Sequence, residues 1–343
     1  MLELINRTED AAEIFRGWAP DHSSVAILAV RTRYHFGPAG LGERGSTEIE
    51  PSDRYYGSPA DSSLARAGDG VPFKTGTDCL FYGTARPPRD GMRGCGVRVT
   101  ANTAAGGFDK SLRVAGRRYW QRSPVGLVPS KPEPVQPTPL CYEYAFGGVD
   151  RKARELETRN PVGMGLNERR ITAKGAELPR IEYPKAAMTS WSKRPPPAGL
   201  GPIAPGWEPR RRRNDQLDTE ALAAGLCPYP DPVPEGLYNT APEDQRLPAP
   251  VTGGERLMLT GFGQACPSPI QLTLPKPDLH LRVTDGHHAS TVELTTDTVE
   301  IDADAGTLDL LARARVPDSE LDTQSRWLVL TRDDNDQAKE AAA

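Results

Sequence analysis

The sequence lacks long apolar runs and a strong excess of either charge. No stretch approaches the roughly 18 consecutive apolar residues that a membrane-spanning helix needs. Residues 1–7 have neither the basic start nor the apolar run of a signal peptide. The formal net charge of -4 gives no general electrostatic attraction to nucleic acid or anionic lipid. We therefore expect a cytoplasmic protein that binds neither membranes nor nucleic acid.

Cysteine and the common catalytic motifs are also scarce. The five cysteines are widely spaced and form no Cys-x-x-Cys pair, which argues against a disulfide framework or zinc ribbon and favours reduced thiols. No phosphate-binding loop, dinucleotide fingerprint or Gly-x-Ser-x-Gly elbow occurs. His287 and His288 are adjacent, and neighbouring strand residues point to opposite faces, so we expect a turn there. The sequence predicts no cofactor and no metal.

Proline and glycine, by contrast, are abundant. The 343 residues include 34 prolines and 33 glycines, and only 37% are hydrophobic. Proline fixes φ and removes a backbone donor, so this composition favours short strands joined by stiff, irregular connections over a helical bundle. We predict a mainly β protein whose antiparallel sheets form a sandwich-like body, with a long proline-rich irregular middle segment and few short helices.

Patterns along the chain divide it into three structured regions and a tail. The N-terminal β region, residues 1–150, has a long surface loop at 37–70 and apolar or alternating runs that predict strands at 24–33, 74–85, 96–100 and 111–116. Residues 151–250 form a proline-rich wrapping segment with helices expected at 151–158 and 216–226. The C-terminal β region, residues 251–332, packs with the first through strands expected at 255–261, 270–274, 280–283, 291–294, 298–302, 307–311 and 327–330. Residues 333–343 predict a disordered tail.

The stretch from Pro139 to Gly148 concentrates large apolar side chains, one carboxylate and a glycine pair. The tract before it is crowded with proline and predicts an extended connector. Glycine adopts positive φ without a Cβ clash. We therefore expect a strand that runs into a forced turn at Gly147 and Gly148, with Glu143 flanked by aromatic rings.

This stretch resembles the Pro-Leu-x-Tyr-Glu-x-Ala-Phe-Gly-Gly signature of a bacterial family, domain-of-unknown-function family 2169, found in type VI secretion clusters. Leu200 and Tyr238 stand where that family usually has Phe, within otherwise similar elements. The resemblance covers roughly residues 1–330, with patterns in the family's order: Lys-x-Leu-x-Val-x-Gly-x-Arg-x-Trp at 110–120, Asn-Pro-x-Gly-x-Gly at 160–165, Leu-Pro-x-Ile-Glu-x-Pro at 178–184, Gly-Phe-Gly-Pro at 199–202 followed by Trp207 and Arg210, and Phe-Asn-x-Ala-Pro-x-Asp-Gln at 238–245.

The resemblance implies a non-enzymatic adaptor or chaperone that binds a type VI secretion effector toxin and helps load it onto the secretion spike. A spike or spike-tip protein would be a further partner. A concave surface or an exposed sheet edge would hold the client. The family-motif residues are then structural or partner-binding: Trp120, Tyr142, Glu143, Phe146, Gly147, Gly148, Asn160, Pro161, Gly163, Glu182, Gly201, Trp207, Arg210, Asn239, Pro242, Asp244 and Gln245.

Several of these residues have competing interpretations. Trp120 is either a core aromatic or a binding platform. Glu143, Glu182 and Asp244 are either acids and bases or acceptors for loop backbone donors. The alternative function is accordingly a hydrolase of carbohydrate or peptide that uses Glu143 and Glu182. The basic run at 210–213 is interpreted as a solvated loop that could dock an acidic partner surface.

Overall fold

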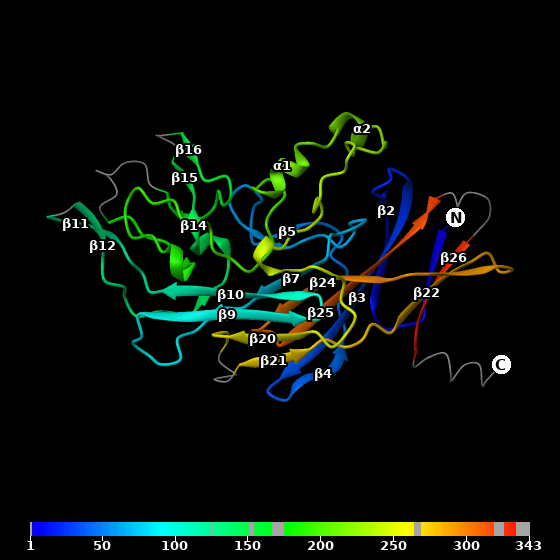
Figure 1. Cartoon of the computed structure of the whole chain (residues 1–343), viewed down its shortest axis with the longest axis horizontal. Helices are drawn as coiled ribbons and strands as arrows, with labels where there is room; N and C mark the ends of the chain where they lie inside the picture. The colour runs from blue at the N-terminus through cyan, green and yellow to red at the C-terminus, as the bar shows by residue number, and fades with distance from the viewer. Residues whose placement is uncertain are drawn as a thin grey trace.

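The computed structural model describes residues 2–124, 126–150, 154–166, 175–263, 269–318 and 326–333. Its many strands, mostly in antiparallel sheets, and few short helices confirm the predicted mainly β fold (Figure 1). The largest sheet has the strand order β19-β7-β24-β25-β3-β2, with β4 paired to β3. Its members are β2 (Ala11–Trp18), β3 (Ser24–Gly37), β4 (Gly40–Gly45), β7 (Thr77–Tyr82), β19 (Arg246–Leu247), β24 (Thr295–Asp302) and β25 (Thr307–Pro317).

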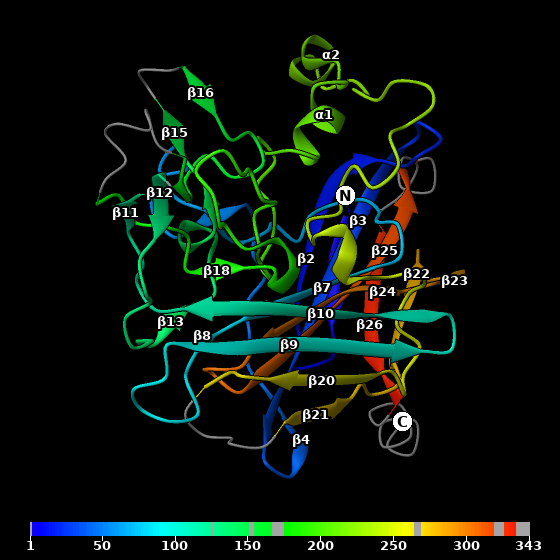
Figure 2. The same cartoon turned by 60° about the vertical axis from the view of Figure 1, so that its left-hand side comes forward.

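Two smaller sheets accompany this seven-stranded sheet. One has the order β18-β10-β9-β20-β21, and Figure 2 shows its long strands β9 and β10 running across the direction of β3 and β25. The other has the order β1-β26-β22-β23. Their members are β9 (Gly94–Thr103), β10 (Gly106–Ala115), β18 (Ile181–Glu182), β20 (Arg256–Thr260), β21 (Ile270–Thr273), β1 (Leu2–Asn6), β22 (Leu279–Thr284), β23 (Ala289–Val292) and β26 (Arg326–Arg332).

Both smaller sheets pack against apolar side chains of the largest one. The main core joins Val99 and Leu259 of the five-stranded sheet to Ile301 of β24. A second core joins the four-stranded sheet to β3 and β25, with Leu281 and Leu28 among its members. Burial of such side chains is the dominant favourable term in folding. The arrangement is therefore sandwich-like, and its layers take strands from both ends of the chain.

The seven-stranded sheet also buries charged side chains. Arg31 of β3 lies within 2.7 Å of Asp69, 2.9 Å of Glu300 and 3.1 Å of Asp309, and all four side chains are buried. A buried charge is tolerated when its partners satisfy it. Asp69 belongs to the segment between β4 and β7, so this segment is tied to the sheet by ion pairs.

The remaining described elements are short. Five two-stranded pairs are formed by β5 (Arg54–Tyr55) with β6 (Leu64–Arg66), β8 (Thr84–Ala85) with β13 (Thr138–Pro139), β11 (Trp120–Ser123) with β12 (Gly126–Pro129), β14 (Phe146–Gly147) with β17 (Met164–Gly165), and β15 (Val149–Asp150) with β16 (Glu155–Leu156). The helices are α1 (Arg210–Asn214), α2 (Thr219–Ala223) and the 3₁₀ turns η1 (Tyr142–Tyr144), η2 (Pro184–Ala186) and η3 (Glu243–Gln245). None of the described helices has the length and apolar character needed to cross a bilayer.

Strand positions were predicted well, and the irregular parts less well. The strands expected at 96–100 and 111–116 lie in β9 and β10, which pair as a hairpin, and β20 to β26 fall on the runs expected in residues 251–332. His287 and His288 lie between β22 and β23, where the Asp285 carboxylate accepts hydrogen bonds from both of their backbone N–H groups at 2.8 and 2.7 Å. The expected tail beyond residue 333 lies outside the described residues.

Four local expectations were wrong. Within the helix expected at 151–158, residues 155–156 form β16, which pairs with β15, and residues 151–153 lie outside the described residues. The surface loop expected at 37–70 contains β4, β5 and β6 and several buried residues. The basic run at 210–213 is helix α1 rather than a loop, and Arg210 is buried in it. The expected strand at 139–148 is interrupted by η1, because the Ala145 N–H turns back to the Tyr142 carbonyl at 3.0 Å.

Candidate functional site

The motif at 139–148, which we call the central motif, is held in place by Asn160, whose side chain is fully buried. Its Nδ2 donates to the carbonyl oxygens of Tyr142 at 2.8 Å and Phe146 at 3.0 Å. A Cβ on Gly147 would lie 2.1 Å from the Asn160 carbonyl oxygen, and one on Gly163 would lie 2.3 Å from Nδ2. Both positions therefore require glycine. The motif at 139–148 and the motif at 160–165 form one hydrogen-bonded unit.

The turn expected at the glycine pair depends on Gly148, which has a φ of 111°. Only glycine adopts this backbone conformation at no steric cost. The Gly148 N–H donates to the Asn160 carbonyl at 2.9 Å. Pro161, directly after Asn160, is partly buried. Position 148 thus requires glycine because its φ is positive. Position 147 requires glycine because the backbone of Asn160 lies too close for a Cβ.

Glu143 and Glu182 each bind different groups of the surrounding loops. The Glu143 carboxylate accepts hydrogen bonds from the Ser63 N–H at 2.8 Å and the Ser63 hydroxyl at 2.7 Å. The buried Glu182 carboxylate accepts from the Met188 N–H at 2.8 Å and lies 2.8 Å from a guanidinium nitrogen of Arg118. Each carboxylate therefore holds a loop in place by accepting hydrogen bonds from it, and we call a buried or partly buried side chain with this role a clamp. These contacts give them no partner in common.

Trp120 lies in a small apolar core that includes Met188, the residue whose N–H donates to Glu182. It is 1% exposed and packs with Phe146, Leu178 and Met188. Its ring meets Trp191 edge-on, with ring centroids 5.9 Å apart. This burial agrees with the core interpretation of Trp120 and leaves it no surface on which to act as a platform.

Tyr142 connects the central motif to the segment at 199–210. Its ring meets Trp207 edge-on at a centroid distance of 5.7 Å, and its hydroxyl lies 3.4 Å from the Gly201 carbonyl oxygen. Arg210 donates through Nη1 to the Ile203 carbonyl at 2.6 Å. Burial lowers the pKa of Arg210 from its ordinary value. The contacts of Trp207 with Tyr142 and of Arg210 with Ile203 therefore hold the segment at 199–210 against the Tyr142 side chain.

Gln245 joins three segments that are far apart in the sequence. Its Nε2 donates to the carbonyl oxygens of Cys79 at 2.8 Å and Leu200 at 2.7 Å. Its Oε1 accepts from the ammonium of Lys110 at 2.9 Å, and Lys110 also donates to Asp244 at 2.7 Å. Burial lowers the pKa of Lys110 to about 8, with the opposing attraction of Asp244 only partly offsetting it. The attraction of Asp244 is weak because its side chain is 49% exposed and solvent screens its charge.

Asn239 makes an analogous clamp at the start of β7. Its side chain exchanges hydrogen bonds with both backbone groups of Thr75 at 3.1 Å and donates to the Asp78 carboxylate at 2.9 Å. Burial alone would raise the pKa of Asp78. The ammonium of Lys74, 2.8 Å away, and the hydrogen bond from Asn239 outweigh this effect, so the pKa of Asp78 is lower than its ordinary value. Asp78 is therefore held ionised in a fully buried position.

These clamps position the walls of a surface pocket of about 500 Å³. Its rim carries Arg159 and Arg212, and the Arg212 Nε lies 3.1 Å from the Glu208 carboxylate. Three pocket residues, Tyr142, Tyr183 and Pro242, come from the family motifs. The proline-lined pocket, as we call it, consists of Tyr142, Thr158, Arg159, Tyr183, Pro196, Pro197, Ile203, Glu208, Pro209, Arg212 and Pro242.

Sequence reasoning missed Lys110, Arg118 and Tyr183, although all three lie in the motifs that it found. The alternation at 110–120 could have indicated Lys110, because it shares a strand face with Leu112 and Val114. All three of these side chains are buried. A lysine on the buried face of a strand implies a paired acceptor. That acceptor is formed by Asp244 and Gln245.

The fold and the clamps define a mainly antiparallel β protein in which side chains of the sequence motifs hold the proline-rich segment, residues 151–250, against two sheets. The chain belongs to the family described as an uncharacterized protein conserved in bacteria (DUF2169), whose model matches residues 21–313. No curated protein and no solved structure matches the chain.

Proposed function

We propose that the protein is an adaptor that binds a type VI secretion effector toxin and helps to load it onto the secretion spike. The proposal rests on the family to which the chain belongs and on the motif resemblance that links this family to type VI secretion. The protein's contribution would be to bind and shield part of the toxin.

One observation supports a binding role above others: motifs from distant parts of the chain converge on the proline-lined pocket. Tyrosine and proline walls offer rigid, largely apolar contact area at little cost in conformational entropy. Arg159 and Arg212, which are paired with Glu157 and Glu208, add polar groups to the pocket. A pocket of this size and composition fits a side chain or a short peptide segment of a protein partner.

The bonding of the carboxylates favours this role over the alternative hydrolase. A general base must reach the proton that it abstracts. The oxygens of Glu143 instead accept hydrogen bonds from Ser63. Glu182 accepts a hydrogen bond from the Met188 N–H and forms an ion pair with Arg118. These contacts fit structural acceptors. The hydrolase remains the alternative, and an activity lost in Glu143→Gln with the fold intact would favour it.

The proposal is tested by co-expressing the protein with an inactivated form of the toxin encoded beside it. A complex of defined ratio should be recovered by size-exclusion chromatography with light scattering, and the toxin should become more soluble by mass action. Deleting the adaptor gene should block delivery of this toxin alone. Absence of a complex together with normal delivery would refute the proposal.

Variants of the pocket locate the binding surface. Pro196→Arg adds a long charged side chain at an exposed position of the pocket, and Arg212→Glu reverses a rim charge. Both should reduce recovery of the complex. Arg211→Glu is the matched control, because Arg211 is on the same helix, is exposed and does not line the pocket. Equal loss in the control would show that the pocket is not the binding surface.

A further inference from the structure

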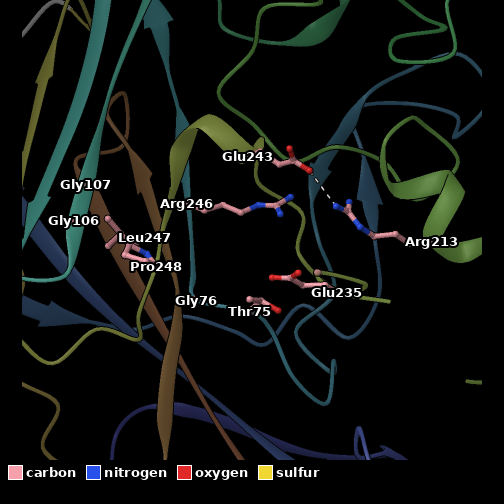
Figure 3. A pocket seen from close by; sticks show the side chains of 11 residues that line it. Thr75, Gly76, Gly106, Gly107, Arg213, Glu235, Glu243, Arg246, Leu247 and Pro248 are labelled. Atoms are coloured by element: carbon pink, nitrogen blue, oxygen red, sulfur yellow. Dashed lines mark hydrogen bonds and ion pairs between the residues drawn. The ribbon is translucent and has the colours of Figure 1, made fainter. Parts of the chain in front are cut away.

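A second pocket, of about 570 Å³, lies next to the clamp that Asn239 forms (Figure 3). Helix α1 contributes neighbouring arginines to the two pockets, Arg212 to the proline-lined pocket and Arg213 to this one. Four glycines leave much of its wall as bare backbone. We call it the arginine-lined pocket; its lining includes Thr75, Arg213, Glu235, Gly236, Glu243 and Arg246.

Two guanidinium groups converge in this pocket. Figure 3 shows Arg213 and Arg246 extending toward each other from opposite walls. A Cβ on Gly236 would lie 3.5 Å from Arg246 Nη1 and 3.8 Å from Arg213 Cζ, so both guanidinium groups lie close to the same glycine. Their side chains are only 20% and 15% exposed. Burial, and also the charge of Arg213, lower the pKa of Arg246, whereas Asp78 raises it.

Neither guanidinium is fully satisfied by the described residues. Arg213 donates through Nη2 to Glu243 at 3.1 Å, but its buried Nη1 has no hydrogen-bond partner among them. Arg246 donates through Nε and Nη2 to the Ala241 carbonyl at 2.8 and 2.5 Å, and its Nε lies 3.5 Å from the Asp78 carboxylate, whereas its Nη1, close to Gly236, has no hydrogen bond to the described residues. A buried donor without an acceptor is costly. The deep part of the pocket therefore has two nearby donors that an anion would satisfy.

The acidic residues of the pocket limit which anion fits. Glu243 is 65% exposed, and Glu235 is exposed and has no hydrogen bond or ion pair among the described residues. Negative charge thus lies at the rim and positive charge lies deeper. The two glutamates offset the charge of the two guanidinium groups, so the pocket has little net positive charge to compensate for the larger desolvation cost of a dianion. A carboxylate also matches the fork of a guanidinium geometrically.

We propose that the arginine-lined pocket binds the carboxylate of an acidic peptide side chain, held between Arg213 and Arg246. The backbone walls and the volume leave room for the residues on either side of that carboxylate. The Thr75 hydroxyl lies at the same pocket as a further polar group. This inference holds whether or not the protein loads a secretion toxin.

The test titrates the full chain with the capped peptide Gly-Glu-Gly-Glu-Gly and with its glutamine counterpart, using calorimetry. The acidic peptide should bind and the glutamine peptide should not. Arg213→Gln should weaken binding about tenfold or more, the expected effect of losing one charge-assisted hydrogen bond. Arg211→Gln, on the outer face of the same helix, should bind as the wild type does. Thr75→Glu, which tethers a carboxylate at an exposed pocket position, should abolish binding.

Three results would overturn the proposal. The first is equal binding of the two peptides. The second is unchanged binding by Arg213→Gln and Thr75→Glu when both variants melt as the wild type does. The third is competition by inorganic phosphate at the same concentration as the peptide, which would indicate a phosphate site. If Arg213→Gln melts early, Thr75→Glu decides the matter, because only the Thr75 side chain changes and its backbone bond to Asn239 stays.

Discussion

Replacing Asn160 is the sharpest test of how the central motif is held. In Asn160→Ala the Phe146 carbonyl loses the side-chain donor at 3.0 Å, and the Tyr142 carbonyl keeps only the Ala145 N–H. An unsatisfied buried acceptor costs about 1–3 kcal/mol, and the missing amide leaves a small cavity. We therefore expect the free energy of unfolding to fall by about 2–4 kcal/mol.

Asn160→Asp should be worse than Asn160→Ala, although it preserves the shape of the side chain. One carboxylate oxygen would face the two carbonyl oxygens at the position of Nδ2, and a buried charge without a donor is strongly unfavourable. The folded-state pKa of the new carboxyl would rise above its unfolded value. Its destabilisation should therefore be smallest at low pH and grow as pH rises through the unfolded pKa of about 4.

Urea denaturation followed by tryptophan fluorescence measures both effects, because Trp120 and Trp207 lie close to the motif. Asn102→Ala, at an exposed position of β9, is the control and should change stability by less than about 0.5 kcal/mol. A loss below about 1 kcal/mol in Asn160→Ala, or an Asp variant more stable than the Ala variant at pH 7, would refute the proposed role of Nδ2.

Two further predictions concern the charged clamps. The Lys110 pKa of about 8 lies below its unfolded value of about 10.4, so between these values the unfolded chain holds a proton that the folded chain lacks. The unfolding free energy of the wild type minus that of Lys110→Met should therefore rise with pH in this window, by at most about 1.4 kcal/mol per pH unit; a fall would show that the Asp244 ion pair dominates. Glu143→Gln should retain stability and partner binding, because an amide can accept from the Ser63 N–H and donate to its hydroxyl, whereas Glu143→Ala should lose about 1–3 kcal/mol. Equal losses in urea denaturation would show instead that the carboxylate charge is required.

The sequence predicted the strands better than the clamps, for a physical reason. Alternating or continuous apolar runs report burial directly, so β3, β9, β10 and β25 fall where expected. Residues 155–156 were predicted as part of a helix, but they pair as a strand with residues 149–150, so the pairing overrides the local helix propensity there. Conformation there depends on contacts that no local window contains.

The candidate site shows the same limit. The motifs indicated which residues matter, but of the two glycines expected to turn with positive φ, Gly147 and Gly148, only Gly148 does so. The sequence did not predict that Gln245 bonds to Cys79 and Leu200, because those segments are far apart along the chain. Pocket walls that depend on such contacts became visible only in three dimensions, as did the convergence of Arg213 and Arg246.

The interleaving of strands from both ends of the chain has a consequence for folding during synthesis. In the seven-stranded sheet, β7 pairs in parallel with β24, and β3 pairs with β25. Such distant pairings give a high contact order, which slows folding. Strand β3 stays without its β25 neighbour until about residue 317 has left the ribosome. Until then it exposes an apolar edge prone to aggregation, so the nascent protein should depend on general chaperones.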